Sequence, residues 1–316
     1  MKRLNLWVRS GSLLLLTLFF SGCSNHNDIH ITRLEQLIFN VDPSALQDSL
    51  LAHGDELNTP LLNVAPNDSK CMAMLHDFAT DPSMQLIFHI TDSIFHDLSW
   101  LERELGDALS RADGIVYDKF YTLVTGDFYD YDRRVFCSDH ELAISLDHYA
   151  VQALHAGVPS YIERLSQPQY ITADCMAAIA RNHIDVPDGD MTLLDYTIAE
   201  GKTVYFLEQT MPRAHDTILL RYSNDQLQWM RHNTEHVWGW LLENNILYST
   251  DLWQYHNIID EAPKTNAFGD ASAPRTPTYI GWQIVRQYMK KTGVSISELF
   301  AETDSRKILA QSGWRP

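Results

Sequence analysis

Apolar residues recur along much of the chain with the period of an α-helix. Between Asp92 and Ala112 they fall at intervals of three and four positions, with acidic residues between them: Ile94, Leu98, Leu101, Leu105 and Leu109. The same period runs through Thr172–Arg181 and Thr192–Thr210. This spacing puts apolar side chains on one face of a helix. Each stretch therefore predicts an amphipathic helix that packs one face into a core.

Capping residues mark further helix starts in the C-terminal part. Ser223-Asn224-Asp225-Gln226 and Ser295-Ile296-Ser297-Glu298 spell capping boxes, in which the first side chain bonds the fourth backbone N–H and the fourth side chain reaches back. We expect the helix after Ser223 to reach Asn244–Asn245. Thr276-Pro277 starts another helix, which Gly293 stops.

Strand patterns are fewer. Ile29–Leu34 predicts a short strand, and the aromatic-rich stretch Ile115–Asp147, with a strand at Glu141–Asp147, predicts a small sheet. Phe128–Arg134 is either a carbohydrate or peptide platform or a sheet face packed on helices, and we favour the packed face. The expected fold is mainly α with a small β component (α+β), a multi-helical single domain without internal repeats.

The first residues follow a different pattern. Lys2, Arg3 and Arg9 precede an apolar run at 13–20, which ends in Ser21-Gly22-Cys23. This is the order of a secretion signal, and the run is too short to span a membrane. We expect residues 1–22 to be removed as a lipoprotein signal peptide, 23–28 to form a tether, and 29–316 to form the globular domain. Cys23 then carries diacylglycerol and a fatty acyl chain such as palmitate.

Composition and charge narrow the classes of partner. Apolar residues make up 45% of the chain, enough for a large core, and the formal net charge is −17 before the three signal-segment cations are lost. Such an acidic chain is not expected to bind nucleic acid, so its membrane contact should be the lipid anchor. Cys71, Cys137 and Cys175 allow one disulfide with three alternative pairings, and their spacing disfavours a thiolate zinc site.

One string is typical of a metal site. His232-Asn233-Thr234-Glu235-His236 spells H-x-x-E-H, in which two histidines on one helix face hold Zn²⁺ and the glutamate acts as general base. A catalytic zinc also needs a third ligand, and no supporting glutamate motif follows. The histidines also fall opposite the apolar stripe of their helix. We therefore expect a solvated or partner-facing surface and no catalytic or metal site, with a zinc metallohydrolase as the alternative.

A family resemblance rests on a set of short motifs in the C-terminal half. The chain resembles the GldB family of gliding motility-associated lipoproteins from the Bacteroidota, as a divergent member. The residues that carry the resemblance are Ala199–Tyr205, Met211-Pro212, Arg221-Tyr222, Trp229, Glu235, Trp238, Ile246–Ser249, Glu261–Pro263, Pro274, Tyr279–Met289 and Ser312–Pro316. Within them, the candidate interaction or structural positions are Gly201, Lys202, Trp229, Glu235, Trp238, Gly281 and Trp282.

The resemblance has implications for function. It implies a non-enzymatic outer-membrane lipoprotein without cofactor, acting as a component or assembly factor of gliding and type IX secretion machinery, with an envelope protein complex as partner. The family is also similar to zinc-protease-like proteins whose H-E-x-x-H would fall near Ala173–Ala177. No ligand set stands there, which implies a degenerate zincin-like scaffold. A surface nutrient-binding lipoprotein is a further alternative.

Overall fold

The computed structural model describes residues 28–54, 57, 59, 61–62, 64–126, 134–154 and 157–316. The predicted signal segment, Cys23 and most of the tether lie outside them. Residues 127–133, which make up nearly all of the aromatic stretch Phe128–Arg134, also lie outside them.

The sheet has four strands in the order β1-β2-β4-β3. Its strands are β1 (Ile31–Arg33), β2 (Lys119–Leu123), β4 (Glu141–Ser145) and the edge strand β3 (Val135–Cys137). β1, β2 and β4 run parallel, whereas β3 is antiparallel to β4. The predicted small sheet is thus confirmed, but both predicted strands end earlier: Leu34 already begins a helix, and 146–149 form a 3₁₀ turn.

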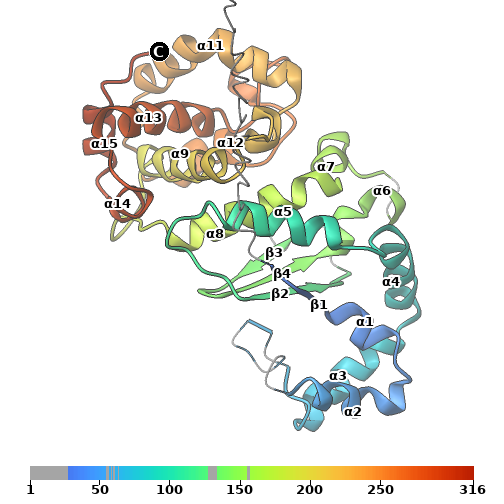
Figure 1. Cartoon of the computed structure of the whole chain (residues 1–316). Helices are drawn as coiled ribbons and strands as arrows, with labels where there is room; N and C mark the ends of the chain where they lie inside the picture. The colour runs from blue at the N-terminus through green and yellow to red at the C-terminus, as the bar shows by residue number, and fades with distance from the viewer. Residues whose placement is uncertain are drawn as a thin grey trace, which may run out of the picture.

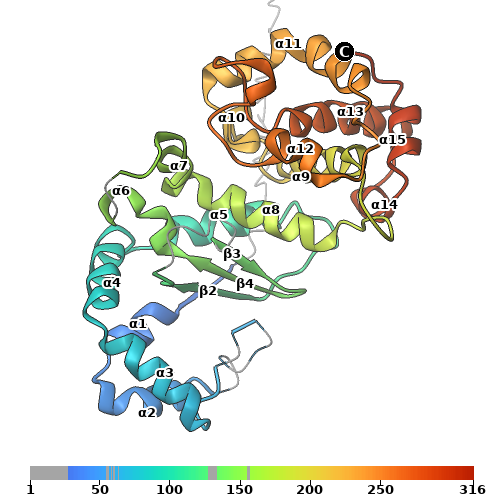
Figure 2. The same cartoon turned by 180° about the vertical axis from the view of Figure 1, so that it is seen from behind.

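Both faces of this sheet are covered. Phe120, Leu142 and Ile144 point into the main core, whereas the intervening residues Tyr121 and Ala143 belong to a second apolar cluster. This alternation follows from the two-residue period of a strand. In Figures 1 and 2, α5 and α8 lie over one face and α1 to α3 lie beyond the other.

The N-terminal helices are α1 (Leu34–Phe39), α2 (Leu46–Ala52), α3 (Ser69–Thr80), α4 (Pro82–Ile94) and α5 (Ser99–Leu109). The single helix predicted from Asp92 to Ala112 is wrong, because Phe95–Leu98 separate α4 from α5. Asp97 accepts the backbone N–H of Ser99 at 2.9 Å, which starts a new helix. The apolar period continues across the break because Phe95 and Leu98 are also buried.

Helices make up the rest of the chain. They are α6 (Val151–Leu154), α7 (Ser160–Leu165), α8 (Ile171–His183), α9 (Leu193–Thr210), α10 (Asp216–Leu220), α11 (Asn224–Glu243), α12 (Leu252–Ile259), α13 (Thr276–Thr292), α14 (Ile296–Ala301) and α15 (Ser305–Ser312). Both predicted capping boxes form, at α11 and α14. The expected mainly α fold with a small sheet is confirmed.

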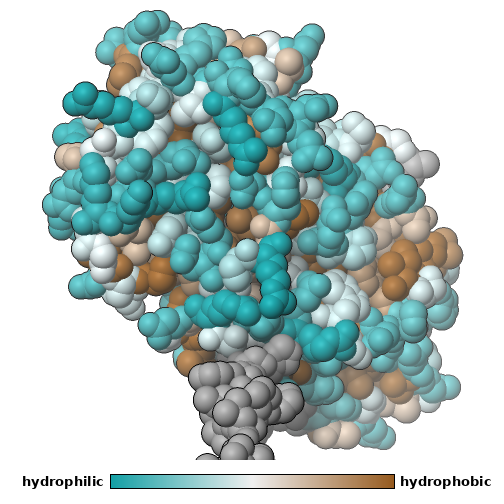
Figure 3. Space-filling model, turned by 45° about the horizontal axis from the view of Figure 1, so that its top comes forward, coloured by the Kyte–Doolittle hydropathy of each residue, from teal (hydrophilic) through white to brown (hydrophobic). Residues whose placement is uncertain are grey.

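One apolar core joins the sheet to the C-terminal helices. α8 contacts β3 and α5 on its sheet side and α9 on its other side, where α9 to α15 gather into a helical lobe (Figure 1). Within the described residues, no helix is both long and apolar enough to cross a bilayer. On the face in Figure 3, hydrophobic residues form small separate areas among hydrophilic ones.

Candidate functional site

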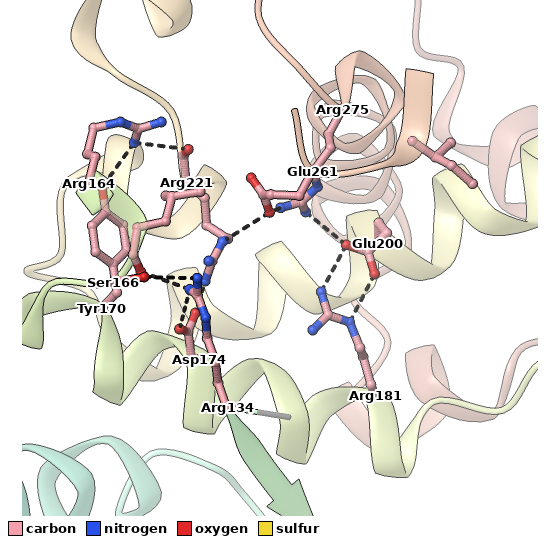
Figure 4. A network of polar contacts seen from close by, with 12 residues as sticks. Arg134, Arg164, Ser166, Tyr170, Asp174, Arg181, Glu200, Arg221, Glu261 and Arg275 are labelled. Carbon is pink, nitrogen blue, oxygen red and sulfur yellow. Dashed lines mark hydrogen bonds and ion pairs between the residues drawn. The ribbon is translucent and has the colours of Figure 1, made fainter. Parts of the chain in front are cut away.

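A cavity of about 890 Å³ lies between α8, α9 and the loops of the helical lobe. α8 contributes Asp174 and Arg181, which are seven residues apart and therefore share one face of the helix. Ala177 and Ala178 lie between them, and their small side chains leave space above the helix. The lining of the cavity combines charged residues, drawn in Figure 4, with aliphatic ones.

The charged residues of the cavity lining begin beside the sheet. Arg134, which directly precedes β3, donates to the carbonyl of Leu165 at 2.9 Å and to Ser166 Oγ at 3.1 Å. Its Nη1 lies 3.9 Å from Asp174 Oδ2, and Arg221 binds the other carboxylate oxygen, Oδ1. Two guanidinium groups therefore share the carboxylate of Asp174.

The same line of charges continues into the helical lobe. Arg221 Nε lies 3.3 Å from Glu261 Oε2, to which Arg275 Nη1 donates at 3.1 Å. Arg275 Nη2 donates to Glu200 Oε2, and Arg181 binds the two oxygens of Glu200 through Nε and Nη2 at 3.0 and 3.1 Å. Seven side chains of alternating sign thus form one chain of ion pairs from Arg134 to Arg181 (Figure 4), which we call the arginine chain.

Two members of the arginine chain have unusual backbones. Arg221 and Arg275 have φ of 61° and 47°, in the left-handed region. A residue with a Cβ pays about 1 kcal/mol or more for that conformation. Arg164 donates to the Arg221 carbonyl at 3.2 Å, and Tyr222 Oη donates to the Arg275 carbonyl at 3.1 Å. Two arginines are therefore held in strained positions from which their side chains reach the cavity.

Charge pairing keeps the carboxyl groups of Glu200 and Glu261 ionised. Burial alone would raise the pKa of Glu200, but Arg181 and Arg275 outweigh it and lower that pKa to about 2. Burial would likewise raise the pKa of Glu261, but Arg275 and Arg221 lower it. These acids therefore stay charged far below neutral pH.

The pKa values of the arginines shift in two directions. Burial opposes the charge of Arg221 and Arg275, but the acids beside them raise both pKa values. Arg134 differs: burial and then the charge of Arg221 lower its pKa. A general acid or base works best with a pKa near the operating pH, which neither Glu200 nor Glu261 has. This arrangement is suited to holding charge in place.

The predicted metal string lies elsewhere. His232, Glu235 and His236 are exposed on α11 and do not line the cavity. His232 Nδ1 lies 2.7 Å from the carbonyl of Gln228 in its own helix, and the His236 ring packs edge-on against Phe268. In the described residues, no three His, Cys, Asp or Glu side chains are grouped so that they could hold a metal.

The string Ala173-Asp174-Cys175-Met176-Ala177 lies on α8, where Ala173, Asp174 and Ala177 line the cavity. Its one acid is paired with Arg221. Cys175 is buried, and it is a free thiol, as are Cys71 and Cys137. Cys137 Sγ lies 3.0 Å from Tyr117 Oη, and burial raises the pKa of that thiol.

A family model described as gliding motility protein GldB matches residues 22–316. The chain belongs to this family. Membership identifies it as a gliding motility-associated lipoprotein and confirms the expected family. No curated protein and no solved structure matches the chain.

Three GldB motif positions lie in the contact between α9, α13 and the C-terminal segment. Gly201 on α9 and Gly281 on α13 are in backbone contact. Lys202 is buried and donates from Nζ to the Glu302 carbonyl at 2.6 Å, and burial lowers its pKa to about 8. These residues hold the lobe together, which is a structural role.

The aromatic motif positions also make packing contacts. Trp282 donates from Nε1 to Glu208 at 2.8 Å, and Arg286 lies over its ring. Trp238 packs edge-on against Trp314 at 5.2 Å between ring centroids. Trp229 packs at a tilt against Phe268, whereas Glu235 faces solvent.

Sequence reasoning did not find the arginine chain, although Arg221, Glu261 and Glu200 fall within the GldB motifs. One local signal was available. Glu200 and Lys202 interrupt the apolar face of α9 between Ile198 and Val204, and a charge in a buried stripe needs a partner. That signal indicates a buried ion pair but does not name the partner.

Proposed function

We propose that this GldB protein is a lipid-anchored, non-enzymatic component or assembly factor of envelope machinery for gliding and type IX secretion. The observation that supports this most directly is the arginine chain. Its carboxylates are paired with guanidinium groups, and the pKa values of Glu200 and Glu261 are lowered, so the cavity holds fixed charges that suit binding. Family membership supplies the link to motility.

The anchor part of the proposal places the domain close to a membrane. If Cys23 carries the lipid, it lies five positions before Asp28, where the described structure begins. Extended chain spans at most about 3.5 Å per residue, so the domain lies within roughly 17 Å of the lipid. The chain's net charge, −17 before the three signal-segment cations are lost, favours acyl insertion over electrostatic contact with anionic lipid. We place this anchor in the outer membrane.

Labelling tests the anchor. Cells that express the full chain are fed radiolabelled palmitate, and the protein is then isolated from separated inner and outer membranes. We expect label in the wild type in the outer-membrane fraction and none in Cys23→Ala. Cys71→Ala is the matched control and should keep its label. Label retained by Cys23→Ala would contradict the anchor.

Crosslinking of the anchored protein in intact cells, followed by mass spectrometry, tests the partner. We expect components of gliding or secretion machinery to be captured by the wild type and to be depleted in Cys23→Ala. Capture of nutrient-uptake proteins in their place would overturn the assignment to that machinery.

A further inference from the structure

The arginine chain encloses an excess of positive charge. Among the described residues it has four guanidinium groups, from Arg134, Arg181, Arg221 and Arg275, and three carboxylates, from Asp174, Glu200 and Glu261. Asp260 also lines the cavity, but it is exposed to solvent, where water screens its charge. A single additional carboxylate would balance the charges of the arginine chain.

Arg181 is the member best placed to receive that carboxylate. Its Nε and Nη2 are both bonded to Glu200, whereas Nη1 bonds to no described group. Its side chain is 51% exposed, compared with 8% for Arg275, so it forms the accessible end of the arginine chain. Guanidinium groups bind carboxylates through charge-assisted hydrogen bonds, which are stronger than neutral ones.

The uncharged part of the cavity lining is largely aliphatic. Its members on α7, α9 and α10 are Ile162, Leu165, Val204, Leu207, Ile218 and Leu219. Of the lining residues, Thr203 and Tyr196 are the uncharged ones with a polar side-chain group. A peptide would leave many backbone groups unpaired against such a surface, whereas an alkyl chain has no polar groups to satisfy.

The volume of the cavity agrees with that of a small-molecule site. Small-molecule sites in proteins enclose about 300–1,000 Å³ and combine apolar walls with a few convergent polar groups. The cavity, at about 890 Å³, falls in this range.

We propose that this cavity binds an aliphatic monocarboxylic acid, with the carboxylate at Arg181 and the alkyl chain against Val204, Leu207 and Ile218. The site goes beyond the proposed envelope function and does not depend on the lipid anchor. Binding is non-covalent. The carboxylate replaces water at Arg181 Nη1, and Glu200 keeps its contacts with Arg181 and Arg275.

Calorimetry tests the site on the purified full chain, with dodecanoate below its micelle concentration as the probe. We expect binding of one dodecanoate per chain. Dodecyltrimethylammonium, with the same tail and the opposite charge, should not bind, and neither should inorganic phosphate or acetate. Equal binding of phosphate would overturn the aliphatic part of the proposal, and binding of the ammonium compound would overturn the role of charge.

Variants locate the site. Arg181→Ala should weaken dodecanoate binding at least about tenfold, since a charge-assisted bond is worth roughly 1.5–3 kcal/mol. Glu200 stays paired with Arg275 in this variant, so the fold is expected to persist, as circular dichroism will show. Ala178→Phe, which places a ring in the cavity, should weaken binding independently.

The control is Arg231→Ala, which removes an arginine of similar exposure that is paired with Asp216 outside the cavity. It should bind dodecanoate like the wild type. Absence of binding by the wild type, or unchanged binding by both Arg181→Ala and Ala178→Phe, would overturn the proposal.

Discussion

Gly201 and Gly281 hold α9 and α13 in direct backbone contact. A Cβ added at Gly201 would lie 2.3 Å from the carbonyl carbon of Gly281, and one added at Gly281 would lie 1.8 Å from the carbonyl oxygen of Thr197. Neither helix can turn aside locally, because the obstacle is the backbone of the other. The crossing therefore sets where Glu200, the neighbour of Gly201, reaches the cavity.

We expect Gly281→Ala to destabilise the protein by about 3 kcal/mol or more, because the two helices must move apart to admit the methyl group. Urea unfolding will measure the loss. Gly239→Ala is the control: this glycine lies in α11 with no atom within 4 Å of the added Cβ. Alanine should stabilise α11 by about 0.5–1 kcal/mol there. Equal effects of the two substitutions would argue against the close crossing.

Glu200→Gln should lower stability in a pH-dependent way. The pKa of Glu200 is about 2 in the fold against an ordinary value of 4.5, so its stabilisation is present above pH 4.5 and is lost as pH falls towards 2. We expect a deficit of about 3 kcal/mol at pH 7 that shrinks below pH 4.5. Urea unfolding between pH 7 and pH 3 checks this. Glu243→Gln, an exposed change on α11, is the control, and a Glu200→Gln deficit that is constant with pH would contradict the prediction.

Ser223→Ala should destabilise the protein by about 1 kcal/mol, because Ser223 Oγ accepts the Gln226 N–H at the start of α11. Thermal unfolding will show the change as a lower Tm. Ser93→Ala is matched to it, since Ser93 is exposed inside α4 and donates only to a carbonyl of its own helix. A Tm shift in Ser93→Ala as large as that in Ser223→Ala would remove the cap as the explanation.

Protein purified without a histidine tag should contain no stoichiometric zinc. His232 and His236 face solvent on α11, and no third ligand approaches them among the described residues. Elemental analysis measures the metal, and unfolding of His232→Ala should differ from wild type by less than about 0.5 kcal/mol. Stoichiometric zinc that disappears in His232→Ala would restore the metallohydrolase alternative.

Elements defined by local chemistry could be predicted from the sequence. The caps at Ser223 and Ser295 form as expected because their partners lie three residues away. The helix predicted over Asp92–Ala112 was wrong because its apolar period reflects burial, which continues through the turn at Phe95–Leu98 as well as through both helices. Periodicity alone does not distinguish one continuous helix from two helices joined by a buried turn.

The arginine chain could not be predicted, because its partners are remote in sequence. Arg275 and Glu200 are 75 residues apart, and Arg221 and Asp174 are 47 apart. Their proximity follows from the packing of α8 on α9 and from the crossing of α9 with α13. The local sequence likewise does not indicate the left-handed backbone of Arg221 and Arg275, since glycine or asparagine is usual at such positions.

Because charges alternate along the arginine chain, its members should differ in how well they tolerate substitution. Neutralising Glu261 removes the only acid between Arg221 and Arg275 in the arginine chain, and each arginine keeps one carboxylate, Asp174 or Glu200. Neutralising Arg181 leaves Glu200 with Arg275 and brings no like charges together. Evolutionary substitutions in this part of the protein should therefore begin at Arg181, the accessible end of the arginine chain. Substitutions further inwards should replace two paired residues together. Arg181 is the position where a change of ligand preference could arise at least risk to folding.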